Sequence, residues 1–248
     1  MVVRFKKVLS LYLLLILLTS LGCLGSNESE KSGEKAKLLE SLEGIQSYSY
    51  RGSREGDLVL EIMTNGSTAQ RKIPVSDNFT AYVERSGLLA EFNMSSLLTS
   101  GYVVKERRVV LGGKMYIYLD GTLSEVVSNP EKVNSTFFSI DVVGIAREYI
   151  KGEPSRIGSV EGYKVYYYPV NASLLPAPNS WLLNGLKVQN GTFELWFKDG
   201  ELSKVALLIE LAGERSKDGV KIKMSLRAKQ TFEIYDLDVK KRVVIEEG

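Results

Sequence analysis

Most covalent and metal chemistry in proteins uses cysteine, histidine or paired carboxylates, and this chain has few of them. Its 248 residues contain one cysteine, Cys23, and no histidine. This excludes a serine–histidine–aspartate triad, a histidine metal site, a histidine proton shuttle and a disulfide. Two carboxylates alone can hydrolyse glycosides, but the pairs Asp236 with Asp238 and Glu246 with Glu247 lie in no diagnostic motif. We expect them to be solvated charges, and we expect no enzyme activity, no metal and no cofactor.

The single thiol follows a short apolar segment. Three basic residues lie within the first seven positions, and residues 8–18 are apolar apart from Ser10. A positive start followed by about 7–15 apolar residues is typical of a secretory signal. A membrane-spanning helix needs about 20 apolar residues. Residues 1–22 are therefore predicted to be a signal peptide.

The approach to the cysteine, Ser20-Leu21-Gly22-Cys23, resembles the lipobox of prokaryotic lipoproteins, which has a small residue just before the cysteine. It differs in having Ser20 where leucine is usual. The resemblance implies cleavage before Cys23 and lipidation of its thiol, with acyl chains such as palmitate contributing about 0.8 kcal/mol per buried CH₂. The polar residues 24–34 would form a flexible tether behind it. The alternative is an uncleaved anchor helix. Both place the domain at the cell surface, on the outer face of the cytoplasmic membrane.

Charge and size set further limits. Three of the 32 basic residues lie in the leader, which leaves 29 against 30 acidic residues. This near-neutral balance lacks the excess of basic residues that is typical of nucleic-acid-binding proteins. With 44% hydrophobic and 25% charged residues, the composition is that of a globular protein. Residues 35–248 suit a single domain.

Asparagine sequons are more frequent than the composition predicts. Asn-X-Ser/Thr occurs at Asn27, Asn65, Asn78, Asn93, Asn134, Asn171 and Asn190. Such a site is modified only when exposed on a secreted protein. The clustering of Asn, Gly, Ser and Thr in turns explains part of the excess. A lipobox together with many sequons favours an N-glycosylating surface, and we expect an archaeal envelope protein.

Hydrophobic periodicity predicts one helix followed by many strands. Residues 35–45 carry apolar residues at helical spacing, and from Ser47 the period changes to two. Asp-Gly pairs between alternating runs indicate hairpins with type I′ turns. A helical insertion is expected over residues 131–151, and a loop or short helix over residues 171–187. Beyond the strand that begins at Ser47, strands are predicted over residues 79–84, 88–94, 102–111, 114–119, 163–170, 193–198, 202–211 and 220–234.

The last predicted strand shows what the sheet must look like. From Val220, apolar residues alternate with Lys221, Lys223, Arg227 and other polar residues. An antiparallel sheet of this kind has one face in water and one apolar face. Helices or a ligand must therefore cover the apolar face.

This order of elements resembles the LolA-like family, which includes periplasmic lipoprotein carriers and mycobacterial lipid-binding lipoproteins. Three stretches carry the resemblance: residues 112–118, residues 160–168, and residues 193–202, although Ser203 replaces the usual proline. The resemblance covers about residues 36–246. It implies an α+β, mostly antiparallel, incomplete β-barrel with an N-terminal helix and a helical insertion over its concave face. It also implies a non-catalytic cavity that holds acyl chains.

Two hypotheses for function follow. In the first, a membrane-tethered lipoprotein binds or carries a lipid or another hydrophobic ligand. Candidate lining residues share the apolar face of the last strands: Leu195, Phe197, Val205, Leu207, Ile209, Ile222, Met224 and Leu226. The alternative is that these residues form an ordinary hydrophobic core covered by the helices. In the second, the domain is a structural or protein-interaction module of the cell envelope with no small-molecule ligand. A continuous apolar cavity favours the first, and a filled core favours the second.

Overall fold

The computed structural model describes residues 33–64, 66–97, 101–177, 186–217 and 220–246. The predicted signal peptide, Cys23 and most of the tether lie outside these ranges. The chain forms two compact units, residues 1–40 and residues 41–248. A helix covers residues 33–44, where the periodicity predicts one. No described helix combines the length and the apolar character that crossing a membrane requires.

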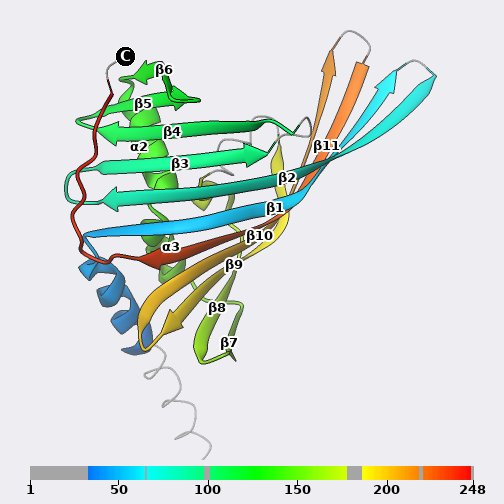
Figure 1. Cartoon of the computed structure of the whole chain (residues 1–248). Coiled ribbons are helices and arrows are strands. Elements are labelled where there is room, and N and C mark those ends of the chain that lie inside the picture. Colours follow the sequence, from blue (N-terminus) through cyan, green and yellow to red (C-terminus); the bar gives the residue numbers. More distant parts are fainter. Residues whose placement is uncertain (1–32, 65, 98–100, 178–185, 218–219, 247–248) are drawn as a thin grey trace, which may run out of the picture. The chain divides into compact units, whose positions relative to one another are not determined.

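Eleven antiparallel strands form one open sheet, so the fold is α+β and mostly antiparallel, as predicted (Figure 1). The strand order is β6-β5-β4-β3-β2-β1-β11-β10-β9-β8-β7. The first and last strands along the chain, β1 and β11, therefore pair in the middle of the sheet. On each side of this pair, strands that are consecutive in the chain are neighbours, so each half is a meander. The strands are β1 (Ser47–Thr64), β2 (Ser67–Glu84), β3 (Leu89–Leu97), β4 (Val103–Leu111), β5 (Lys114–Leu119), β6 (Thr122–Val127), β7 (Arg156–Val160), β8 (Tyr163–Pro169), β9 (Lys187–Lys198), β10 (Glu201–Lys217) and β11 (Val220–Tyr235).

Two helices connect the edge strands β6 and β7. They are α2 (Pro130–Ile140) and α3 (Val142–Lys151). The sequence predicts one helix over residues 131–151, but the structure breaks it at Asp141, whose backbone is not helical (φ −74°, ψ 76°). The Asp141 carboxylate accepts a hydrogen bond from the Gly144 N–H, because aspartate stabilises a helix start better than a helix interior. A short 3₁₀ helix, Ala172–Leu174, lies in the predicted loop 171–187.

Two of the predicted type I′ Asp-Gly turns are confirmed, and the third, at residues 218–219, lies outside the described residues. Asp120 and Gly121 have φ of 50° and 85°, and Asp199 and Gly200 have φ of 52° and 86°. The predicted strands did not include β6, β7, residues 67–78 of β2 or residues 187–192 of β9. Most residues in these segments are exposed or half-buried, so they lack the alternation that marks a half-buried strand.

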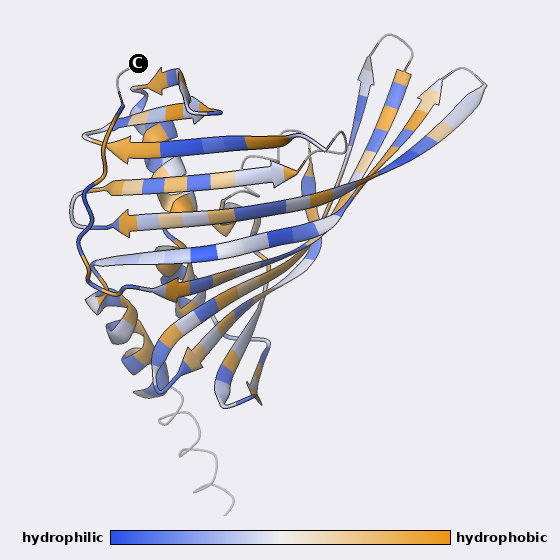
Figure 2. Cartoon of the chain, viewed as in Figure 1, coloured by the Kyte–Doolittle hydropathy of each residue, from blue (hydrophilic) through white to orange (hydrophobic). Residues whose placement is uncertain are grey.

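Side chains separate the sheet into two faces. We call the face that carries Tyr48, Tyr50 and Phe79 the helix face, because α2 and α3 pack on it (Figure 1). The opposite face is called the outer face. An aromatic cluster fills the helix face: the rings of Tyr50 and Phe232 lie 5.6 Å apart, and those of Phe79 and Phe232 lie 5.2 Å apart. Figure 2 shows the alternation of apolar and polar residues along the strands that produces this separation.

Gly52 makes this cluster possible. A Cβ at this position would lie 2.1 Å from the Thr231 carbonyl oxygen and 2.3 Å from the Phe79 ring. The aromatic ring therefore occupies the space that any other residue would need. Gly52 is also paired with Phe232 on the neighbouring strand.

We predict that Gly52→Ala lowers the free energy of unfolding by about 1–3 kcal/mol, the usual cost of overpacking. Gly44→Ala is the matched control, because a Cβ there meets nothing within 4 Å. In a helix, the control should be neutral or stabilise by up to about 1 kcal/mol. Urea unfolding of both variants measures this, and equal stabilities would contradict the packing account.

Candidate functional site

The eight candidate lining residues all lie on the helix face. Strand register places them there, because cross-strand partners share a face and residues along a strand alternate. Six of them are at most 3% exposed: Leu195, Phe197, Val205, Leu207, Ile209 and Leu226. Ile222 and Met224 are only half-buried.

The six buried candidates belong to the core under the helices. Next to them on β9, the Phe193 ring stacks on Tyr149 of α3, with centroids 4.0 Å apart and planes 6° apart. The Phe197 ring meets Tyr166 edge-on at 5.6 Å. In this conformation, protein side chains already cover these residues. A ligand reaches them only if the helices move.

The accessible part of the helix face lies toward the ends of the β1–β2 and β10–β11 hairpins, which run beyond α2 and α3 (Figure 1). Met224 is paired with Leu60, and Ile222 with Ile62. Six half-buried apolar residues form what we call the hairpin strip: Leu58, Leu60, Ile62, Ile73, Ile222 and Met224. The candidates named from the sequence include the two β11 members, but not the three β1 members or Ile73 of β2.

A buried carboxylate holds the helices to the sheet. Asp141 Oδ1 accepts hydrogen bonds from the Tyr48 hydroxyl at 2.8 Å and from the Gly144 N–H at 2.8 Å. Its Oδ2 lies 3.2 Å from Arg85 Nε. The Tyr48 hydroxyl oxygen also accepts the Val143 N–H at 3.1 Å. We call these contacts the Asp141 latch.

The latch reaches beyond the sheet and the insertion. Arg85 Nη1 donates to the carbonyl oxygens of Leu42 and Ile45, at 3.0 and 3.1 Å. Burial, reinforced by the Asp141 charge, raises the pKa of Tyr48 well above 10, so this hydroxyl keeps its proton and remains a donor to Asp141. Sequence periodicity carries no signal for the latch, because its members lie far apart in the chain.

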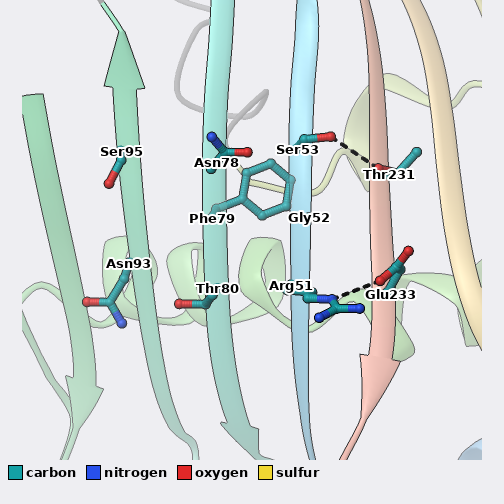
Figure 3. A pocket seen from close by; sticks show the side chains of 10 residues that line it. All are labelled: Arg51, Gly52, Ser53, Asn78, Phe79, Thr80, Asn93, Ser95, Thr231 and Glu233. Carbon is teal, nitrogen blue, oxygen red and sulfur yellow. Dashed lines mark hydrogen bonds and ion pairs between the residues drawn. The ribbon is translucent and has the colours of Figure 1, made fainter. Parts of the chain in front are cut away.

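The outer face carries an open polar groove of about 450 Å³ over the middle of the sheet. Figure 3 shows its polar side chains, with the Ser53–Thr231 and Arg51–Glu233 contacts drawn, and the Phe79 ring of the helix face beside Gly52. Asn78 and Asn93, two of the predicted sequon residues, line it. Eight of its ten lining residues are polar, and Phe79 and Gly52 are the exceptions.

The sequons differ in accessibility. Asn78, Asn134, Asn171 and Asn190 are exposed, and Asn93 is half-buried. Asn171 and Asn190 also accept hydrogen bonds from nearby backbone N–H groups. Asn27 and Asn65 lie outside the described residues.

The C-terminal carboxylates have structural partners. Asp238 accepts the N–H groups of Gln46 and Ser47, and Asp236 pairs with Lys241 at 2.9 Å. The segment then crosses the outer face: the Lys241 N–H donates to the Tyr82 hydroxyl, and further along the tail the Tyr118 hydroxyl donates to the Glu246 carbonyl oxygen. Asp236 and Asp238 are both exposed, as expected, and each also makes a contact that holds this tail.

No cluster of three or more His, Cys, Asp or Glu side chains suited to a metal ion occurs among the described residues. No protein-family model matches the chain. No curated protein matches its sequence either.

Solved structures give distant matches. A DUF1329 family protein from Desulfovibrio piger is 11% identical with a TM-score of 0.24, and the match covers 85% of this chain and 94% of that one. A beta-barrel-like DUF1849 protein from Brucella abortus is 13% identical with a TM-score of 0.26, covering 78% and 100%. The ywiB protein from Bacillus subtilis is 11% identical with a TM-score of 0.19, covering 76% and 92%. Similarities this low say nothing about function.

We predict that Asp141→Ala lowers the free energy of unfolding by about 3–5 kcal/mol, because it removes the only carboxylate among the described residues that pairs with the Arg85 side chain, which is 13% exposed, and leaves the buried Tyr48 hydroxyl without its acceptor. Asp141→Asn keeps an oxygen acceptor for Tyr48 and Gly144 and should cost less. Urea unfolding measures both. A loss below about 1 kcal/mol for the alanine variant would show that the latch does not hold the helices.

Proposed function

We propose that the protein is a membrane-tethered extracytoplasmic lipoprotein that binds or carries a lipid or another hydrophobic ligand, without catalysis. The observation that carries the proposal is the hairpin strip, an apolar surface that continues the buried core of the helix face beyond the helices. The finer fold assignment, a LolA-like incomplete barrel, belongs to the same proposal.

The hydrophobic effect gives the strip its expected ligand. Fully burying a leucine, isoleucine or methionine side chain is worth about 1.5–3 kcal/mol. Each of the six half-buried residues of the strip can therefore gain part of this energy when a chain covers it. An acyl or isoprenoid chain fits better than a protein helix in one respect: it has no backbone polar groups that need partners against an apolar strip.

In this proposal, the membrane to which the protein is tethered is the source of the ligand. Lipidation of Cys23 would keep the domain close to a membrane, from which a hydrophobic ligand can be taken. We further propose that the protein works on the outer face of the cytoplasmic membrane of an archaeal-type cell. There, the exposed sequons at Asn78, Asn134, Asn171 and Asn190 would be available for glycosylation.

We predict that the purified protein carries lipid detectable by native mass spectrometry, and that Met224→Glu reduces the bound fraction about tenfold, since a charge on the strip opposes an apolar chain. Ser225→Glu is the matched control, because Ser225 is the next residue of the strand and is exposed on the outer face. The control should keep its lipid. Protein that remains empty when offered membrane lipid would sink the proposal and favour an envelope scaffold.

We predict that Cys23→Ser abolishes lipid attachment, since a hydroxyl does not replace the thiol in this modification. Metabolic labelling with a lipid precursor measures attachment, and the mass of the protein shows whether residues 1–22 are removed. Unchanged labelling in the serine variant would contradict lipidation at Cys23. An unlabelled but membrane-bound wild type that retains residues 1–22 would instead show an anchor helix.

A further inference from the structure

Apart from the Asp141 latch, the described part of the helix face contains a buried charged pair. Arg54 on β1 lies opposite Asp77 on β2, and their side chains are only 5% and 4% exposed. Arg54 Nε donates to Asp77 Oδ2 at 2.5 Å, and Nη2 contacts the same oxygen. The other guanidinium nitrogen, Nη1, is buried and has no hydrogen-bond partner.

An unpartnered buried donor is costly, and this one belongs to a charged group. Native structures pair such groups with protein, water or ligand. Burial lowers the pKa of Arg54, and the nearby Asp77 carboxylate opposes this effect. The missing partner of Nη1 is therefore an acceptor, because arginine only donates.

The charge balance decides which acceptor fits. Asp77 already neutralises Arg54, so an added anion would leave a net negative charge inside the protein. Burying an unpaired charge costs far more than burying a hydrogen-bonded neutral group. An uncharged oxygen, such as an ester or ketone carbonyl, satisfies Nη1 without this cost.

The strand register places this donor at the inner end of the hairpin strip. Along β1, the next helix-face residues after Arg54 are Gly56, Leu58, Leu60 and Ile62, so β1 itself becomes apolar beyond the polar pair. On the flanking strands, Arg71 lies opposite Leu60 and Arg215 lies opposite Ile222. Six residues from Arg54 to Leu60 span about 20 Å at about 3.3 Å per residue. A chain lying on the strip would thus have its polar end at Arg54.

We propose that Arg54, held by Asp77, is the polar subsite of the ligand site and binds the uncharged carbonyl oxygen of a long-chain ester or ketone. This inference rests on the proposed function and names its ligand class. It makes a neutral carbonyl lipid the preferred ligand, over both a free fatty acid and a plain hydrocarbon.

The test compares three probes of similar chain length against the full-length protein in detergent: methyl palmitate, palmitate and heptadecane. Native mass spectrometry measures the bound fraction of each. The expected result is that methyl palmitate binds about tenfold or more tightly than the other two, the usual effect of a hydrogen bond from a charged donor. Equal binding of the ester and the alkane would overturn the inference, as a water molecule at Nη1 would then suffice. Tightest binding of palmitate would also overturn it.

Paired variants locate the subsite. Removing Arg54 alone would leave Asp77 buried and unpaired, so the double variant Arg54→Met with Asp77→Leu is used, checked for folding by circular dichroism. The double variant should bind the ester and the alkane equally.

Tyr50→Phe is the control, because the Tyr50 hydroxyl is also buried without a partner and lies on the same face of β1. This variant should keep the preference for methyl palmitate over heptadecane. Loss of the preference in Tyr50→Phe, or its survival in the double variant, would contradict the assignment. If no probe binds the wild type, the proposed function itself fails.

Discussion

The Asp141 carboxylate is the contact on which the arrangement of the helix face depends. It begins α3, accepts the Tyr48 hydroxyl from β1 and faces Arg85 at the end of β2. Because the helices form the only covalent link between the two edge strands, their position decides how much of the helix face is covered. A buried charge held by several donors gives that position a single well-defined geometry. The same contacts would have to break or shift for a ligand to reach the core beneath the helices.

The two faces of the sheet carry different kinds of residues and contacts. The helix face carries the core, the latch, the Arg54–Asp77 pair and the hairpin strip. The outer face carries the open groove, the exposed sequon residues Asn78 and Asn190, and the C-terminal tail. Glycans at Asn78 would extend away from the helices. A ligand on the hairpin strip would therefore not compete with them. Under the proposed function, this separation would let one thin sheet bind a hydrophobic ligand on one face and carry glycans on the other.

The sequence predicted the fold class because period-two patterns and Asp-Gly turns are local signals. It predicted the shared face of Leu195 to Leu226 for the same reason. It did not predict the break at Asp141 or the burial of Arg54, because both depend on partners that are distant in the chain. Tyr48 and Asp141 are 93 residues apart. Polar residues inside a sheet look like solvated ones until their cross-strand neighbours are known.

Photo-crosslinking with a long-chain ester that carries a photoreactive group along its chain tests the central claim most directly. If the ligand lies on the helix face, labelled residues on β1 and β11 should be even-numbered, such as Leu58, Leu60, Ile222 and Met224, because alternate residues share a face. The odd-numbered neighbours Val59, Lys223 and Ser225 should remain unlabelled. Labelling of the odd-numbered set, or of the C-terminal tail on the outer face, would contradict the account.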